Sequence, residues 1–336
     1  MAREKSHPRT IKLKTGEIKL EHKYPLRVLF ISDLHCGEQF GIQPPEFETS
    51  DGRILLPNKV QETIYRQWER IKEVADQYHV QYIFVVGDLL GGLNPKEKGK
   101  YITCDMKDQV RMATKLLAEI AKDRIIYIIS GTRYHLIPRG MGEPEEEVAI
   151  RLRDMGYKAY YIGDIAFVEI EGVKRKRRIF VAHEAPTGLV YPATLMSRDI
   201  NWARQAQAEG KTPPVDAIIR AHLHFWLHVD HSGIHAIQLP CFMGLTPYKS
   251  TIKYFFRLQP DIGGVLMLVD EYGRLRFWHF LMPREERIKM LEDIATIQPI
   301  SLPRYEEMTS EIKRYAKMAK EMSKYLKERK ERGGEN

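Results

Sequence analysis

Residues 27–37 have the sequence RVLFISDLHCG. Four apolar residues in succession, between a charged residue and a later glycine, predict a strand that is buried on both faces. Asp33 and His35 follow this run two positions apart. In an extended chain such residues point the same way, so both side chains can contact one object. Open α/β sheets bind ligands beyond the carboxyl ends of their strands, so this position predicts a functional site.

The same pattern, an apolar run that ends in a polar group, recurs four times downstream. The runs lie at residues 82–86, 125–129, 178–182 and 215–220. Asp and His are rare beside apolar strands unless they have partners, so their repetition predicts one shared site. The polar groups that follow these runs are Asp88, Thr132, His135, His183, His222 and His224.

The periodicity of the remaining chain predicts a mixed α/β fold. Apolar residues at three-to-four spacing predict helices over residues 59–79, 107–122, 143–155 and 195–209. The second half favours hairpins over 166–183, 225–239 and 264–281. Together these elements predict a β-sandwich flanked by helices. The expected parts are a polar N-terminal arm or edge strand (1–24), a main domain (25–285) with a long loop at 38–58, and a charged helical C-terminal extension (286–336).

Composition indicates a cytoplasmic protein with an anionic partner. The 336 residues carry a net charge of +8 and three cysteines, none of them in a CxxC pair. No apolar run approaches the ~18 residues of a membrane span, and residues 1–20 are too polar for a signal peptide. The basic balance favours nucleic acid, nucleotide or phosphoprotein as partner, although a heat-adapted surface gives a similar balance.

Histidines mixed with carboxylates are typical ligands of first-row divalent ions such as Mn, Zn, Fe, Ni or Co. Seven candidate donors are too many for one tetrahedral ion and suit two adjacent ions. Two ions about 3.5–4 Å apart can stabilise the attacking and the leaving oxygen in phosphoester hydrolysis.

The ordered motifs resemble those of the calcineurin-like metallophosphoesterases across residues 25–285. The family order is Asp-x-His, Gly-Asp, Gly-Asn-His, His and Gly-His-x-His. The resemblance implies a β-sandwich with metals at the strand ends and a bridging hydroxide that attacks phosphorus. It further implies that Asp88 bridges two ions. The other implied ligands are Asp33, His35 and His224 for the first ion, and His183 and His222 for the second.

Two departures from the family pattern concern the third and last motifs. Residues 131–135 are Gly-Thr-Arg-Tyr-His, so Thr132 stands where an Asn carbonyl would bind the second ion. His135 is displaced by two positions and is expected to act as the acid for the leaving group or as a substitute ligand. Arg133 is free to hold a phosphate oxygen. The last motif begins with Ala221 in place of Gly.

The sequence therefore predicts a two-metal phosphoesterase, with manganese as the first expectation and phosphodiester cleavage, including nuclease activity, slightly favoured over monoester cleavage. The alternative is a metal-binding or nucleic-acid-binding scaffold with weak or no turnover. The basic run 174–178 is expected to be a solvated turn, with a phosphate-backbone contact as the alternative. The C-terminal helix is expected to pack on the domain or to form a homodimer, ahead of a nucleic-acid contact.

Overall fold

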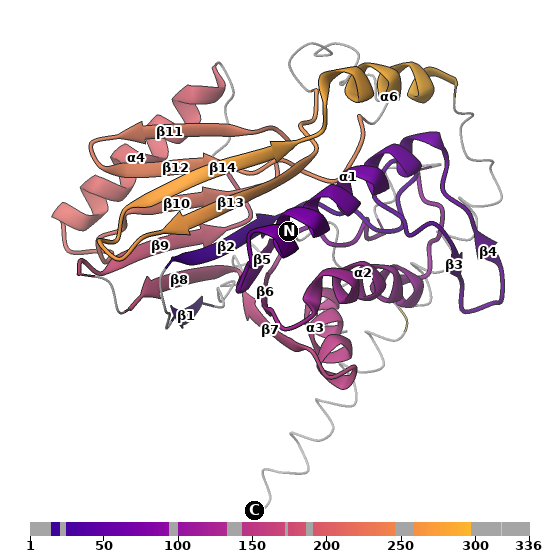
Figure 1. The fold of residues 1–336 in the computed structure, drawn as a ribbon, viewed down its shortest axis with the longest axis horizontal. Coiled ribbons are helices and arrows are strands. Elements are labelled where there is room, and N and C mark those ends of the chain that lie inside the picture. The colour runs from indigo at the N-terminus through magenta and orange to yellow at the C-terminus, as the bar shows by residue number, and fades with distance from the viewer. Residues whose placement is uncertain are drawn as a thin grey trace, which may run out of the picture.

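Two six-stranded mixed sheets form the centre of the protein (Figure 1). The computed structural model describes residues 15–20, 25–93, 100–132, 143–171, 174–185, 191–245, 259–296 and 317. Helices lie outside the two sheets, so the described chain has the layered order helix, sheet, sheet, helix.

The first of these sheets, sheet B, carries the strand predicted from residues 27–37. Its order is β14-β13-β2-β5-β6-β7. From β2 to β7 all neighbours are parallel, while β13 runs antiparallel to both β2 and β14. The strands are β2 (Leu26–Ile31), β5 (Tyr82–Val86), β6 (Ile125–Ile129), β7 (Lys158–Gly163), β13 (Gly263–Val269) and β14 (Leu275–Leu281).

Sheet A is built mainly from the second half of the chain, in the order β1-β8-β9-β10-β12-β11. Its β8–β9 and β11–β12 pairs are antiparallel, as the predicted hairpins require. The β11–β12 turn places Ser232 and Gly233 at φ 55° and 78°, as a tight two-residue hairpin turn demands. The strands are β1 (Thr15–Leu20), β8 (Ile165–Ile170), β9 (Arg177–Ala182), β10 (Ala217–Arg220), β11 (Leu227–His231) and β12 (Ile234–Gln238).

Helices connect the parallel strands of sheet B and cover its outer face. This layer contains α1 (Lys59–Gln77), α2 (Met106–Ala121) and α3 (Pro144–Asp154), and α4 (Pro192–Ala208) covers sheet A. The helix α6 (Arg284–Thr296) lies beside α1, where Arg70 and Glu286 form an ion pair at 2.5 Å. None of the described helices combines the length and apolar character of a membrane span.

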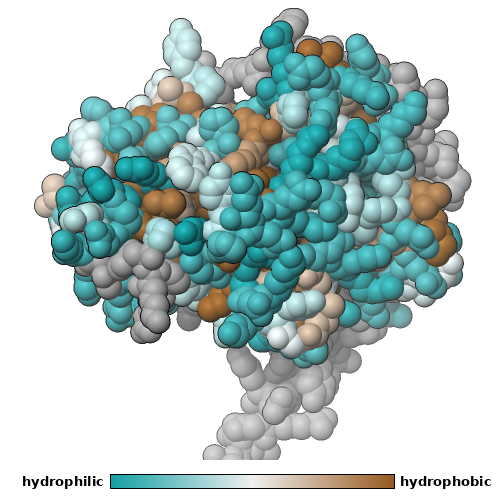
Figure 2. Space-filling model, viewed as in Figure 1, coloured by the Kyte–Doolittle hydropathy of each residue, from teal (hydrophilic) through white to brown (hydrophobic). Residues whose placement is uncertain are grey.

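Alternation along β2 shows how one strand holds two layers together. Val28 and Phe30 face sheet A, while Leu29 and Ile31 pack under the helices, and all four are buried. The strand is therefore buried on both faces, as its continuous apolar run predicted. The face of the molecule shown in Figure 2 is mainly hydrophilic, with hydrophobic residues in separate groups.

The mixed α/β sandwich with flanking helices is confirmed, residues 1–24 contain the edge strand that was one of the two expectations, and the differences lie in two segments. The predicted loop 38–58 contains a small two-stranded sheet of β3 (Phe47–Glu48) and β4 (Ile54–Leu55). Strand β7 had not been predicted. Part of the predicted N-terminal arm forms the edge strand β1, and the division of the chain into three parts stays a prediction. Apart from α6 and residue 317, the predicted C-terminal helix lies outside the described residues.

Candidate metal centre

The predicted ligands lie where strands of the two sheets end. Asp33 and His35 follow β2, and Asp88 follows β5 with only Gly87 between. Parallel strands bring their carboxyl ends to the same edge of a sheet, so β2 and β5 deliver their ligands side by side. In sheet A, β9 and β10 are also parallel. Those two strands are followed by His183, His222 and His224.

An unusual backbone conformation marks these strand ends. Eight non-glycine residues of the described chain have positive φ, and five of them are predicted ligands. Asp and His tolerate this left-handed region better than most residues, but it still costs on the order of 1 kcal/mol each and concentrates at functional sites. The extended geometry expected for Asp33 and His35 is therefore wrong, since β2 ends at Ile31 and both residues turn sharply. The five are Asp33, His35, Asp88, His222 and His224.

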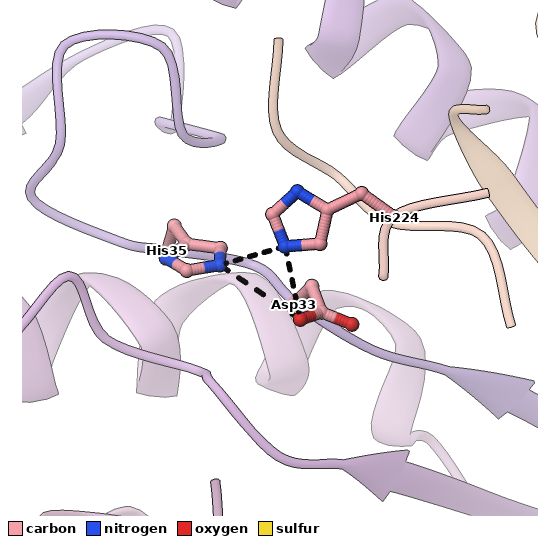
Figure 3. Close-up of side chains that lie close together, drawn as sticks. All are labelled: Asp33, His35 and His224. Atoms are coloured by element: carbon pink, nitrogen blue, oxygen red, sulfur yellow. Dashed lines mark hydrogen bonds and ion pairs between the residues drawn. The ribbon is translucent and has the colours of Figure 1, made fainter. Parts of the chain in front are cut away.

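The first group of donors consists of Asp33, His35 and His224 (Figure 3). Asp33 Oδ1 lies 3.1 Å from His224 Nε2 and 3.8 Å from His35 Nε2, and the two Nε2 atoms are 3.2 Å apart. Two donors bound at ~2.0 Å to one tetrahedral zinc-type ion would be about 3.3 Å apart. The three atoms are thus spaced as ligands of one ion.

The second group consists of Asp88, His183 and His222. Asp88 Oδ2 lies 2.9 Å from His183 Nε2 and 3.8 Å from His222 Nδ1. Thr132 lies beside this group, because its Oγ1 is 3.1 Å from Asp88 Oδ2 and 3.1 Å from His222 Nδ1. The Thr132 backbone N–H also donates to Asp88 Oδ1 at 2.5 Å. The structure therefore places Thr132 beside the second group, and its role as a metal ligand stays a prediction.

The two groups adjoin through Asp33. Its Oδ1 lies 3.8 Å from His183 Nε2, and its Oδ2 accepts a hydrogen bond from the backbone N–H of His222 at 3.2 Å. Such contact is what a pair of neighbouring ions requires. Burial lowers the pKa of His35, but Asp33, Glu38 and, to a smaller extent, Asp88 raise it well above its usual value. Bridging of both ions by Asp88 stays a prediction.

The electrostatics of the centre favour a positive charge between the donors. Burial raises the pKa of Asp33, but attraction to His183 and His224 outweighs burial and holds it well below its usual value. Burial likewise lowers the pKa of His183, yet Asp88 and Asp33 raise it to about 9. Burial lowers the pKa of His224. The metal-free centre therefore holds protons that a divalent cation can displace on binding.

The local packing fits a bound metal. His183 donates from Nδ1 to the carbonyl of Val86 at 2.8 Å, and its buried Nε2 faces the donor group, where its partner is the ion pair with Asp88 Oδ2 at 2.9 Å. A Cβ on Gly87 would lie 2.4 Å from the His183 ring, and one on Gly131 would lie 2.2 Å from Asp88 Oδ1. Histidine nitrogen and carboxylate oxygen together suit first-row divalent ions. The residues of both groups thus fit a first-row divalent ion.

Two buried carboxyl groups near the centre were not predicted as functional residues. Glu38 Oε1 lies 3.0 Å from His35 Nδ1. Glu145 lies in the first turn of α3 and is 1% exposed, and burial raises its pKa to about 7. The only sequence signals were an acid three residues after His35 and an acidic helix start. The predicted acid His135 and phosphate ligand Arg133 lie outside the described residues.

Comparisons with known proteins found similarity only among solved structures, since no family model and no curated protein matches the chain. A novel archaeal phosphodiesterase is 12% identical over 76% of this chain and 100% of its own, with a TM-score of 0.37. Zinc-bound Vps29 from Entamoeba histolytica is 12% identical over 77% and 100%, with a TM-score of 0.37. A predicted phosphoesterase from Streptococcus pneumoniae is 11% identical over 77% and 99%, with a TM-score of 0.29.

At these identities and TM-scores the similarities carry no information about activity. The architecture itself is clear from the sheets and the site. Two stacked mixed sheets with flanking helices, and donor residues at the strand ends, have the arrangement that the resemblance of the motifs implied. The chain has this arrangement and carries two groups of residues that can each hold a metal ion.

Proposed function

We propose that this protein is a two-metal-dependent phosphoesterase that hydrolyses a P–O bond. The observation that carries the proposal is that two adjoining groups of donors lie where strands end, on residues whose backbone is mostly in the left-handed region. Six side chains from four strand ends meet there, although five of them occupy a backbone region that costs free energy. A purely structural cap at each strand end would not require the six to converge.

In this proposal the chain's own residues place two divalent ions next to each other. Asp33, His35 and His224 would hold the first ion, and Asp88, His183 and His222 would hold the second. Asp88 would be the ligand that both ions share. When bound, the ions lower the pKa of a water and polarise the phosphoryl oxygens. Thr132 fixes the Asp88 carboxylate through two hydrogen bonds.

The remaining predicted roles belong to residues 133–135. We propose that Arg133 holds a phosphate oxygen and that His135 protonates the leaving group or replaces a ligand. Manganese is the first metal to test, followed by zinc, iron, nickel and cobalt. A preference for diesters, nucleic acid among them, rests on the net charge of +8. A cytoplasmic location and a homodimer through the C-terminal helix remain proposals.

The altered third motif favours one second candidate, a scaffold of the same fold with weak or no turnover. Thr132 replaces the expected Asn, and its hydroxyl already contacts Asp88 and His222. A hydroxyl engaged in this way is a poorer ligand for a second ion than an amide oxygen. The number of ions bound per chain separates the two candidates, because one ion or none favours the scaffold.

The test is hydrolysis of bis-p-nitrophenyl phosphate and p-nitrophenyl phosphate by metal-stripped protein to which Mn, Zn, Ni or Mg is returned. We expect turnover that depends on the metal and is lost in Asp88→Asn. Loss of several kcal/mol of transition-state stabilisation corresponds to a decrease on the order of 10³-fold or more.

The matched control is Asp216→Asn, because Asp216 precedes β10, at the end of the strand away from His222, and binds Arg177 there. Hydrolysis by this control should match the wild type. Full activity of Asp88→Asn would refute the two-metal account. No turnover with any metal, together with fewer than two bound ions, would establish the scaffold.

A further inference from the structure

A buried carboxylate stands directly behind the first donor group. Glu38 is only 1% exposed, and its Oε1 lies 3.0 Å from Nδ1 of His35. A carboxylate removed from water is costly unless it is paired or hydrogen-bonded. Its position therefore requires a specific partner, and the imidazole of His35 meets that requirement.

The contact decides which nitrogen of His35 faces the centre. Nε2 is directed at the donor group, 3.2 Å from His224 Nε2 and 3.8 Å from Asp33 Oδ1. An acceptor at Nδ1 keeps the proton on that nitrogen and leaves the Nε2 lone pair for a metal ion. Without Glu38 the proton could occupy either nitrogen and the ring could turn.

Elements on both sides hold Glu38 in place. Its backbone N–H donates to the carbonyl of His35 at 3.1 Å, and Gln61 of α1 donates from Nε2 to the Glu38 carbonyl at 3.1 Å. On the other side, a Cβ on Gly91 would lie 2.4 Å from Glu38 Cγ. The backbone of Glu38 is thus anchored by α1, and its side chain packs against the segment after β5.

We propose that Glu38 is a positioning residue that fixes the tautomer and the orientation of His35 for the first metal ion. The inference rests on the proposed function, because it assumes that this donor group binds a metal. Glu38 itself does not bind the ion. Its effect reaches the metal only through the His35 ring.

The expected effect is weaker binding of the first ion. Loss of a group that orients a ligating histidine lowers metal affinity about 10–100-fold. Glu38→Ala should show this full loss. Glu38→Gln should restore most of the affinity, because its amide oxygen can still accept from Nδ1 although the charge is gone.

The experiment isolates the first donor group in a His183→Ala background, where the second group lacks a ligand. Cobalt(II) is titrated into this protein and into its Glu38→Ala and Glu38→Gln derivatives, and the visible spectrum reports both affinity and ligand geometry. We expect a weaker and altered spectrum for Ala and a spectrum close to the parent for Gln. A merely structural role would not produce this rescue.

The control is Glu119→Gln, since Glu119 is a partly buried carboxylate that binds Tyr65, Trp68 and Lys72 in the helical layer. It should leave the cobalt spectrum unchanged. If Glu38→Ala does not fold, Gly91→Ala provides the second variant, because its Cβ displaces Glu38 while all side chains around His35 remain. It should weaken cobalt binding in the same way.

Wild-type affinity and an unchanged spectrum in Glu38→Ala, or in Gly91→Ala if that variant is needed, would overturn the positioning role. That result leaves the proposed function intact. If the unmodified protein binds no divalent ion, the proposed function fails first, and the inference fails with it. Metal binding by the unmodified protein tests the proposed function. The ratio of cobalt affinities between the variant and its parent tests the role of Glu38.

Discussion

The position of Asp88 in the candidate metal centre depends on close packing against a glycine as well as on a hydrogen bond. Asp88 has φ 47° and receives the backbone N–H of Thr132 on Oδ1. Gly131 lies so close that a Cβ there would come within 2.2 Å of both the backbone N and Oδ1 of Asp88. The glycine of the third motif is therefore needed for the close approach of the β5 and β6 ends and not for a turn.

We expect Gly131→Ala to displace Asp88 and to weaken binding of the second ion at least tenfold, by analogy with the loss of a ligand-orienting group. The first ion should stay bound. Metal content after dialysis, measured against the wild type, checks this result. Gly210→Ala is the control for metal content, because its Cβ meets nothing within 4 Å and the substitution costs only the strain of a φ of 68°. Two ions retained at wild-type affinity in Gly131→Ala would contradict the steric account.

Glu145 predicts a pH dependence of stability in the metal-free protein. Burial raises its pKa from 4.5 to about 7. The folded protein therefore binds this proton more tightly than the unfolded chain, so stability falls as pH rises from 4.5 through 7 and stays lower above that range. Each pKa unit corresponds to about 1.4 kcal/mol, so the penalty at pH 8 is on the order of 3 kcal/mol.

Glu145→Gln should remove this penalty, because an amide has nearly the same size and shape and cannot ionise. Urea unfolding at pH 5 and pH 8 measures the outcome. The variant should gain stability over the wild type at pH 8 and gain much less at pH 5. A difference that is the same at both pH values would show that the charge of Glu145 is not responsible.

At the scale of elements, helix α1 shows how local capping reaches the site. Asn58 accepts from the Gln61 N–H at 3.0 Å, and the Gln61 side chain accepts from the Asn58 N–H at 3.1 Å. The same Gln61 donates to the carbonyls of Glu38 and Gly41. Through Gln61, the capping box of α1 therefore also anchors residues 38–41, which follow the donors Asp33 and His35.

Asn58→Ala removes the cap and the hydrogen bond from Asn58 Nδ2 to the Gln39 carbonyl. We expect a loss of about 1–2 kcal/mol in the free energy of unfolding. Asn58→Ser should lose less, because serine can still cap the helix. Urea unfolding of both variants checks this order. If alanine and serine are equally destabilising, the cap contributes little and the Gln39 hydrogen bond accounts for the loss.

Sequence patterns predicted the elements that have strong periodicity and missed those that depend on neighbours. The runs of β2, β5 and β6 are apolar on both faces and were predicted within a residue or two. Strand β7 is an edge strand with exposed and buried residues mixed, so no apolar run marked it. The six converging metal-site donors were predicted from their order, whereas Glu38 and Glu145 were not. Their roles arise from burial and from contacts that form only in the folded chain.

At the scale of the whole molecule, a basic cavity lies at the opposite end of sheet A from the metal centre. It has a volume of about 400 Å³, with five cationic and two acidic side chains among its lining residues. Arg177 and Arg178 begin β9, whereas His183 follows its end, and six residues of strand span ~20 Å. Arg177 binds Asp216 at 2.5 Å and Arg178 binds Glu169, so part of the basic run is neutralised. Arg175 and Lys176 remain exposed.

Because of this separation, the double substitution Arg175→Ala and Lys176→Ala should leave hydrolysis of bis-p-nitrophenyl phosphate within about twofold of the wild type. Both residues lie far from the proposed ions, and an exposed charge acts weakly at that range.

If single-stranded nucleic acid is the substrate and its backbone reaches this cavity, the same variant should bind it more weakly. The slope of log affinity against log salt should then fall by about 0.7 for each phosphate that the variant no longer neutralises. Anisotropy with a labelled single strand at several salt concentrations measures that slope. An unchanged slope would show that the basic residues of the cavity do not contact the nucleic acid. A decrease in hydrolysis of the small diester well beyond twofold would show that these residues affect the metal centre despite their distance from it.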